Sequence, residues 1–313
     1  MKILIDVDAL QATGIIDAAL ADRLRAYALR DTGSSAINIL LALGAVAVAA
    51  GMGALVFSPW TLGALGLAFV AAGAMVRGGA RGQWALLAKI WIVIGALMLA
   101  AGQAALLDRP MEGALIGALI LGGIGVYVGS HLLVALTPFL LEAALGGSTG
   151  YWHASYEIVV EEPTLTILLF TGLGAGAWLL ARALTDPAQG LALTFARICV
   201  ILVNFGFWIG SLWGDRPGHS WSNADLPSTG EPTIPALAYV VAWFAALALA
   251  ALWGARNGRR FLVNVCATFA AIHFYTQWFE RFGPDPIAVI AAGVATIAIG
   301  LGFWRFNRAA APA

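Results

Sequence analysis

Long apolar runs recur along the whole chain, and the short stretches between them hold most of the charged residues. A helix of about twenty apolar residues is long enough to cross the hydrocarbon core of a bilayer. The pattern therefore predicts an all-α fold, a polytopic transmembrane helical bundle over residues 35–308 with a short tail at 309–313. The candidate spans, about ten in number, lie at 36–57, 61–76, 84–106, 112–130, 132–147, 163–181, 189–211, 234–254, 260–280 and 286–304.

Composition supports this class and excludes others. The chain is 61% hydrophobic and 11% charged, whereas an ordinary soluble domain is about 25% charged. The formal net charge is zero and no basic stripe is present, so nucleic acid is excluded as a partner and the lipid bilayer is the expected one. Both cysteines fall inside apolar runs, where they provide no disulfide framework.

The first 34 residues are charged and amphipathic, and they predict a short cytosolic helical hairpin. Asp8 can cap a helix that runs through Thr13, Gly14 breaks it, and a second helix runs from Asp17 to Arg30. The hairpin could dock a protein partner or lie against the membrane surface. Because the first long apolar run follows this segment, we expect an uncleaved first span and no signal peptide.

The fifth apolar run is short, contains Pro138 and Glu142, and decides the orientation of everything after it. If all ten runs cross from a cytoplasmic N-terminus, the inner loops hold twelve Lys and Arg residues and the outer loops three: Arg109, Arg216 and Arg281. If the fifth run does not cross, the division becomes eight to seven. Cytoplasmic loops are enriched in Lys and Arg, so ten spans with both termini in the cytoplasm are favoured.

Glycine stripes occur in several of these runs, at 44–53, 113–129 and 172–176. Small residues allow helix backbones to approach closely in lipid. Each stripe lies inside an apolar helix with no strand before it, so we interpret the stripes as helix packing and not as phosphate-binding loops.

The N-terminal part of the chain resembles a known family. A hairpin with the sequence Gly14-Ile15-Ile16 is followed by Ala19, Leu20 and Leu24, and the glycine-rich first run closes on Phe57-Ser58-Pro59-Trp60. Over about the first 110 residues this pattern is similar to a family of predicted bacterial multi-pass membrane proteins of unknown function, although that family typically has Asn before the Trp. The resemblance implies a bacterial inner membrane and supplies no catalytic or binding residue.

Two polar stripes inside the apolar runs are the candidates for a pathway or binding site, because polar groups within a membrane are costly. The seventh and ninth runs carry them at helical spacing: Arg197, Asn204, Trp208 and Ser211, and then His273, Gln277 and Glu280. Each stripe could line a hydrated path or hydrogen-bond a neighbouring helix. Arg197 is also long enough to reach the membrane surface, and a lone histidine such as His273 most often only hydrogen-bonds a neighbour.

A metal site is a further candidate, because histidine and carboxylate residues gather on or near the predicted outer face. The candidate ligands are His153, His219, His273 and Glu142, which together suit a divalent cation such as zinc or copper. No His or Cys pair has ligand spacing. An acidic outer rim that includes Glu162 and Asp215 is also the ordinary complement of the positive-inside rule, so both interpretations stay open.

No nucleophile elbow, zincin helix, haem-attachment sequence or dinucleotide fingerprint is present, so we expect no enzyme and the sequence implies no cofactor. Two hypotheses remain. The first is a transporter or channel for a small solute or ion, with the seventh and ninth spans along its path. The second is a non-catalytic membrane scaffold, sensor or accessory subunit that recruits a partner through the N-terminal hairpin. The polar stripes favour the first.

Overall fold

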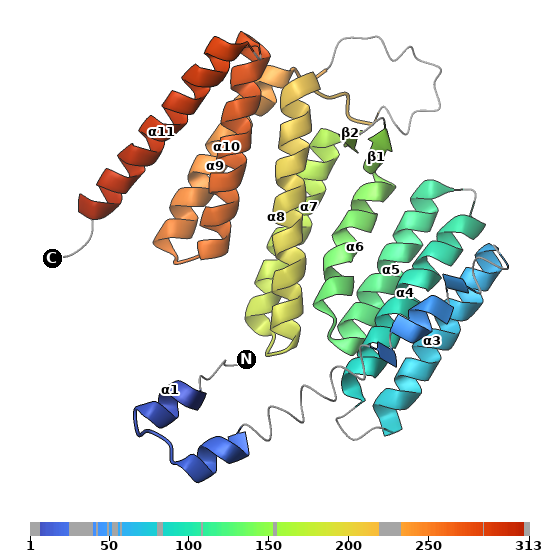
Figure 1. Ribbon diagram of the computed structural model, residues 1–313. Coiled ribbons are helices and arrows are strands. Elements are labelled where there is room, and N and C mark those ends of the chain that lie inside the picture. Colours follow the sequence, from blue (N-terminus) through green and yellow to red (C-terminus); the bar gives the residue numbers. More distant parts are fainter. Residues whose placement is uncertain are drawn as a thin grey trace. The chain divides into compact units, whose positions relative to one another are not determined.

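The computed structural model describes residues 7–24, 40–41, 43–48, 50–51, 56, 58–79, 84–107, 109–152, 155–218, 233–283 and 285–309. The elements are α1 (Val7–Ala12), α3 (Pro59–Gly79), α4 (Ala85–Leu106), α5 (Pro110–Val128), α6 (His131–Ala144), β1 (Ser148–Trp152), β2 (Ser155–Val159), α7 (Pro163–Ala183), α8 (Ala188–Trp213), α9 (Ala236–Arg256), α10 (Arg260–Phe282) and α11 (Pro286–Ala309) (Figure 1). β1 and β2 form an antiparallel hairpin that the sequence did not lead us to expect. The chain divides into two compact units, Met1–Ala144 with Ala177–Phe195, and Leu145–Gly176 with Ala196–Ala313.

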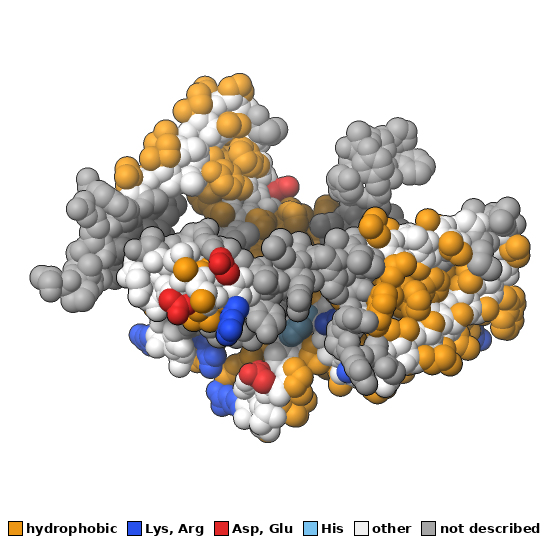
Figure 2. All heavy atoms as spheres, turned by 60° about the horizontal axis from the view of Figure 1, so that its bottom comes forward, with side chains coloured by type: hydrophobic (Ala, Val, Ile, Leu, Met, Phe, Trp, Pro, Cys, Tyr) orange, Lys and Arg blue, Asp and Glu red, His pale blue; other side chains and the backbone are white. Residues whose placement is uncertain are grey.

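Six helices of the described residues are long and apolar enough to cross a membrane, as expected for a multi-pass membrane protein. They are α3, α4, α5, α7, α8 and α9, and each lies within a few residues of a predicted run. Figure 2 shows hydrophobic side chains over much of the helix surface, with charged side chains in few places. Such a surface suits a lipid environment and not water.

The other four predicted spans do not reach the same standard. α6 has 14 residues, which at a rise of 1.5 Å per residue is about 21 Å, against about 30 Å of hydrocarbon. α11 is apolar over Pro286–Ala298, and apart from Leu301 its side chains beyond that residue lie outside those described, as does a large part of the run 36–57. α10 has 23 residues, but its polar side chains leave it less apolar than the six.

α3 and α4 of the first unit pack with their backbones almost in contact. A Cβ atom added to Gly95 would lie 2.6 Å from the carbonyl oxygen of Gly66, and one added to Gly66 would lie 2.7 Å from the amide nitrogen of Leu99. One added to Gly102 would lie 2.7 Å from the amide nitrogen of Gly63. Only glycine fits at such distances, so these positions set the separation of the two helices.

None of Gly66, Gly95 and Gly102 belongs to the stripes predicted from the sequence. Among the predicted glycines, those that meet a neighbouring helix are Gly113, Gly117, Gly122, Gly125 and Gly174. Those that face open space are Gly44, Gly51, Gly123, Gly129, Gly172 and Gly176. The packing interpretation is therefore confirmed for part of each of two stripes only.

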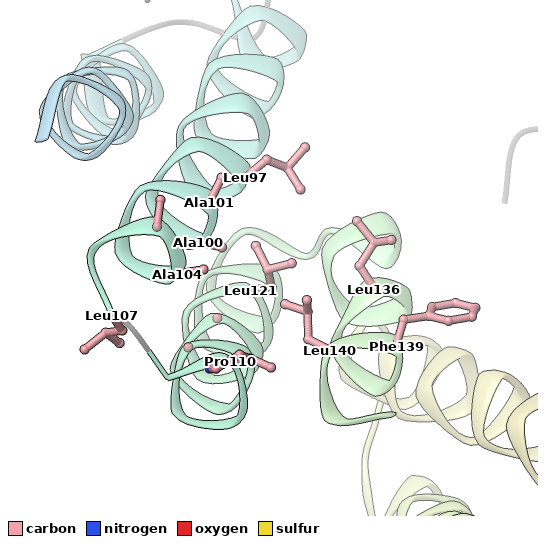
Figure 3. A pocket seen from close by; sticks show the side chains of 14 residues that line it. Leu97, Ala100, Ala101, Ala104, Leu107, Pro110, Leu121, Leu136, Phe139 and Leu140 are labelled. Carbon is pink, nitrogen blue, oxygen red and sulfur yellow. The ribbon is translucent and has the colours of Figure 1, made fainter. Parts of the chain in front are cut away.

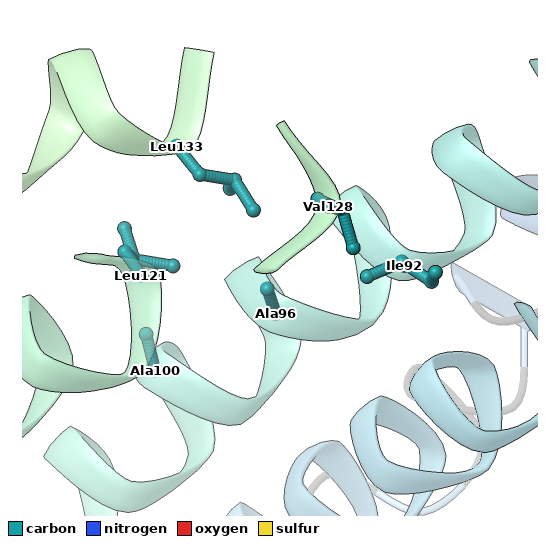
Figure 4. Packing of buried hydrophobic residues seen from close by; sticks show 6 residues of the cluster. All are labelled: Ile92, Ala96, Ala100, Leu121, Val128 and Leu133. Atoms are coloured by element: carbon teal, nitrogen blue, oxygen red, sulfur yellow. The ribbon is translucent and has the colours of Figure 1, made fainter. Parts of the chain in front are cut away.

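The core of the first unit lies between α4, α5 and α6. Its buried side chains are Ile92, Ala96, Ala100, Leu121, Val128 and Leu133 (Figure 4). Polar side chains of this unit cap helix ends: Lys89 Nζ donates to the carbonyl oxygen of Gly129 at 3.1 Å, where α5 ends in a left-handed residue. His131 Nδ1 lies 2.7 Å from Thr194 Oγ1 and so joins α6 to the start of α8.

The described N-terminal residues form two short helices, α1 and residues 18–24. Gly14 lies between them with a φ of +70°, and Asp17 Oδ1 accepts a hydrogen bond from the amide of Leu20 at 2.6 Å. The predicted break at Gly14 and the helix start at Asp17 are confirmed. The rest of the second helix, to Arg30, lies outside the described residues, and the cytosolic location stays a prediction.

The second unit contains the strand hairpin, most of α7 and α8, and α9 to α11. Its core is formed by Trp243 and Leu247 of α9 with Cys266 and Phe269 of α10. α11 begins after Gly283, and Asp285 caps it by accepting hydrogen bonds from two amides of its first turn. α11 diverges from α10 toward its C-terminal end (Figure 1).

Candidate functional site

The polar stripe of α8 is engaged in contacts with its neighbours. Asn204 is 7% exposed, its Oδ1 accepts a hydrogen bond from Trp243 Nε1 at 2.9 Å, and its Nδ2 donates to the carbonyl oxygen of Val200. Trp208 Nε1 donates to Thr276 Oγ1 at 3.0 Å, which joins α8 to α10. These contacts are those of a helix–helix interface, one of the two interpretations that the sequence left open.

The residues at the two ends of the same stripe, Ser211 and Arg197, also contact other groups of the protein. Ser211 is buried, and its Oγ donates to the carbonyl oxygen of Trp208 at 2.7 Å. Arg197 is exposed, and its guanidinium lies 5.2 Å from the centre of the Phe261 ring of α10, a cation–π contact. A cavity of about 210 Å³ reaches Asn204, but apart from Thr171 its other lining residues are apolar or glycine.

A larger cavity, the α9–α11 pocket, lies on the other side of α10 and has a volume of about 800 Å³. Its lining comes from α9, α10 and Thr296 of α11. Most of that lining is hydrocarbon, with side chains such as Leu247, Ala251, Cys266, Ala270 and Phe274. A pocket of this size and character is typical of a small-molecule site.

Two residues that line this pocket, His273 and Gln277, each have a buried polar atom without a hydrogen-bond partner, Nδ1 and Nε2 respectively. The imidazole of His273 packs edge-to-face against Trp243, with ring centres 4.8 Å apart. A buried polar atom left unpaired costs about 1–3 kcal/mol. The two residues are four apart on α10 and therefore lie on adjacent turns of one helix face.

The end of the pocket near the C-terminus of α10 differs from the sequence prediction. Arg281 and Glu280 are both exposed, but only Arg281, four residues beyond Gln277, lines the pocket. The face predicted as His273, Gln277 and Glu280 thus continues to Arg281. The face of α10 that lines the pocket is centred on Cys266, Ala270 and Phe274. His273, Gln277 and Arg281, which are spaced four residues apart, lie along one side of that face.

The mouth of the pocket is framed by contacts between α10 and α11. Trp278 Nε1 donates to the carbonyl oxygen of Ala288 at 3.0 Å, and the hydroxyl groups of Tyr275 and Thr296 lie 2.8 Å apart. Three of these side chains, those of Tyr275, Trp278 and Thr296, line the pocket. The hydrogen bonds hold α11 against α10 without using His273 or Gln277.

A buried acidic cluster at the start of α7 was missed as a site. Asp215, 5% exposed, accepts hydrogen bonds from the amide of Thr164 at 2.8 Å, from the Thr164 hydroxyl and from Tyr239 OH at 3.2 Å. Glu162 is fully buried, and its Oε2 accepts the amide of Gly218 at 2.7 Å. The carboxylate of Asp215 therefore caps α7 from outside the helix, where the helix dipole favours negative charge.

The sequence placed Glu162 and Asp215 in an acidic outer rim. In the structure both carboxylates are buried and bind backbone amides, and so stabilise the structure of the loop after α8. The segment Glu162-Pro163-Thr164 could have been recognised as a helix start, because proline is favoured at the first helical position. Asp215, 51 residues from Thr164, carried no such signal.

The predicted metal ligands are not brought together in the part of the chain that the structure describes. His153 and His219 lie outside it. Glu142 is buried in the first unit, and His273 lies in the second. Among the described residues, no three His, Cys, Asp or Glu side chains are close enough to hold a metal ion.

A second large cavity, of about 870 Å³, lies between α4, α5 and α6 of the first unit (Figure 3). Leu97, Leu136, Phe139 and Leu140 point around it, and its lining consists of Leu, Ala, Gly, Pro and Phe only. Such a lining offers dispersion contacts but no group that could orient a ligand. The α9–α11 pocket is therefore the better candidate for a specific site.

Comparison with known proteins adds no assignment to this geometry. No family model, curated protein or solved structure matches the chain.

Proposed function

We propose that this protein is a multi-pass transporter of the bacterial inner membrane, and that the α9–α11 pocket is its binding site for a small amphiphilic solute. The observation that carries the proposal is the pair of buried, unpaired atoms His273 Nδ1 and Gln277 Nε2 in a pocket of about 800 Å³. A solute that accepts hydrogen bonds from these atoms would remove the cost of leaving them unpaired.

The character of the pocket supports an amphiphilic solute over a bare ion. A hydrated ion needs polar groups on several sides, whereas the α9 wall is formed by residues such as Val240, Phe244 and Leu247. The α8 stripe, which the sequence offered as a second part of the path, has its polar groups occupied by Trp243 and Thr276. We therefore place the solute on the α10 face alone.

The ten-span arrangement with both termini in the cytoplasm is part of the proposal. It is supported by the distribution of twelve Lys and Arg residues to the inner loops against three to the outer. α6 must then cross as a short helix, which requires protein and not lipid around its ends. The bacterial inner membrane is proposed from the resemblance of the first 110 residues and from the same charge distribution.

Transport is tested with the purified full-length protein in vesicles. Fluorescently labelled single-chain amphiphiles with anionic, neutral and cationic heads are placed in both leaflets, and their loss to an external reductant is followed in time. We expect the protein to speed the flux of at least one probe, and His273→Leu with Gln277→Leu to reduce that flux at least tenfold.

The matched control is Asn264→Leu with Thr268→Val, two exposed polar residues of α10 outside the pocket lining. This control should transport like the unmodified protein. The proposal is wrong if no probe moves faster than in protein-free vesicles, or if the double pocket variant retains full flux.

A second candidate, a scaffold or accessory subunit, is favoured by one observation at the N-terminus. Ile15 and Leu20 of the helical pair are 70% and 45% exposed, so the hairpin presents an apolar surface. Ile15→Asp with Leu20→Asp should then reduce cross-linking of a partner subunit in native membranes and leave the flux of the vesicle assay unchanged. Unchanged cross-linking would exclude a docking role for this surface.

A further inference from the structure

We propose that the ligand of the α9–α11 pocket is an anionic acyl lipid, whose acidic head lies at Arg281 and whose chain runs along the apolar wall toward Cys266. This inference deepens the proposed function and rests on the same pocket, but it concerns binding and so can be tested apart from transport.

The first step is the order of hydrogen-bond donors along the pocket. His273, Gln277 and Arg281 follow one another at intervals of four residues and all line it. The amide Nε2 of Gln277 and the guanidinium of Arg281 can only donate, and His273 Nδ1 donates in one tautomer. A ligand that satisfies this row must therefore present acceptor oxygens.

The second step is the spacing of the row. At 1.5 Å rise per residue, each step is about 6 Å and the whole row about 12 Å. In a phospholipid, the phosphate oxygens and the ester carbonyl oxygens of the acyl chains are separated by about one such step, whereas a fatty acid has its carboxylate alone. A phosphate at Arg281 thus brings an ester carbonyl within reach of Gln277, and a fatty acid would use the Arg281 end of the row.

The third step is charge. Arg281 forms no ion pair with any residue that the structure describes, and no acidic side chain lines the pocket. Asp285, which lies nearby in the chain, has its carboxylate engaged by the amides of Ile287 and Ala288. Arg281 is therefore the only charged side chain in the lining of the pocket, and guanidinium groups bind carboxylate and phosphate through paired hydrogen bonds.

The fourth step is the position of the row relative to a bilayer. Arg281 stands in the last turn of α10, with Trp278 and Tyr275 just before it, and aromatic side chains of this kind mark the level of lipid headgroups. The rest of the lining includes apolar side chains such as Ala270 and Leu247, which suit an acyl chain.

The test measures lipid binding to the purified full-length protein by native mass spectrometry and by the lipid-induced shift in Tm. The probes are phosphatidylglycerol and phosphatidylcholine with identical acyl chains, together with oleate and oleyl alcohol. We expect at least one of the two anionic probes to bind at least tenfold more tightly than its uncharged or zwitterionic counterpart. Which of the two binds decides between a phosphate and a carboxylate head.

Variants assign the binding to the pocket. Arg281→Gln should weaken the anionic probe about tenfold, the effect of losing one charge-assisted hydrogen bond. Gln277→Leu should weaken it severalfold, and Arg256→Gln, an exposed arginine of α9 outside the lining, should leave it unchanged. The Tm of each variant without lipid shows whether it is folded.

The inference is wrong if phosphatidylcholine and oleyl alcohol bind as tightly as the anionic probes, or if folded Arg281→Gln protein binds them unchanged. Flux of a neutral or cationic probe that depends on His273 and Gln277, without anionic lipid binding, would leave transport standing and overturn this inference. Anionic lipid binding without flux of any probe would support this inference and overturn the proposal of transport.

Discussion

The indole Nε1–H of Trp243 donates to Asn204 Oδ1 at 2.9 Å, and both side chains are buried. This bond joins α9 to α8 and satisfies two polar groups that would otherwise lie among hydrocarbon side chains. Trp243 also supplies the ring against which His273 packs. One tryptophan thus connects the α8 stripe with the α9–α11 pocket.

Asn204→Leu tests whether that bond is structural. We expect a loss of about 1 kcal/mol in stability, because hydrogen bonds between membrane helices contribute about that much, and an unchanged flux in vesicles. Thermal unfolding in detergent and the vesicle assay measure the two effects. Loss of flux in a variant of normal stability would indicate that the α8 stripe lines the transport path.

Asp215→Ala removes the cap of α7. Replacing a capping side chain costs about 0.5–2 kcal/mol, and the burial of the amide of Thr164 places the expected effect at the upper end. The measurement is the Tm of the purified protein, with Asp186→Ala, an exposed loop residue, as the control. Equal Tm values for the two variants would contradict the cap.

Gly95→Ala tests the contact between α3 and α4. The added methyl group would overlap the carbonyl oxygen of Gly66, and overpacking of this kind costs about 1–3 kcal/mol. Gly176→Ala places the same methyl group in open space, where helix propensity predicts a gain of up to about 1 kcal/mol. Opposite changes in Tm are expected, and a stable Gly95→Ala protein would show that the helices are farther apart.

The ten-span arrangement predicts the sides on which two turns lie. In a background with Cys199→Ala and Cys266→Ala, Asn257→Cys should resist a membrane-impermeant maleimide applied to intact cells, and Asp285→Cys should react. The opposite pattern is expected if α6 does not cross. Reaction at both positions, or at neither, would exclude both arrangements.

Hydrophobic patterning located the helices well because crossing a bilayer is a requirement on local sequence. α3, α4, α5 and α7 to α9 all begin and end within a few residues of the predicted runs. The strand pair β1–β2 was not predicted, because a strand of five residues is too short to show a clear hydrophobic alternation. A loop between two membrane spans also does not require a hydrophobic pattern. The predicted number of spans depended on α6, whose 14 residues are apolar but short for a helix that crosses a bilayer.

The site was predictable in its spacing and not in its orientation. Four-residue steps placed His273 and Gln277 on one face from sequence alone. Whether Glu280 or Arg281 continues that face into the pocket depends on how α10 is rotated against α9 and α11, and this is decided by packing. The contact of Gly66 with Gly95 and the bond of Asp215 with Thr164 likewise join residues distant in the chain, for which a single sequence holds no record.

The backbone contact of α3 with α4 has a consequence for how this chain can change under selection. At Gly66 and Gly95 every other amino acid adds atoms where the backbone of the partner helix already lies. Substitutions at these positions are therefore selected against in both helices. Where side chains such as Leu67 are exposed on the helix surface, one apolar residue serves as well as another. Among functional variants of this chain, we therefore expect glycine to be retained at these positions while the surrounding apolar residues vary.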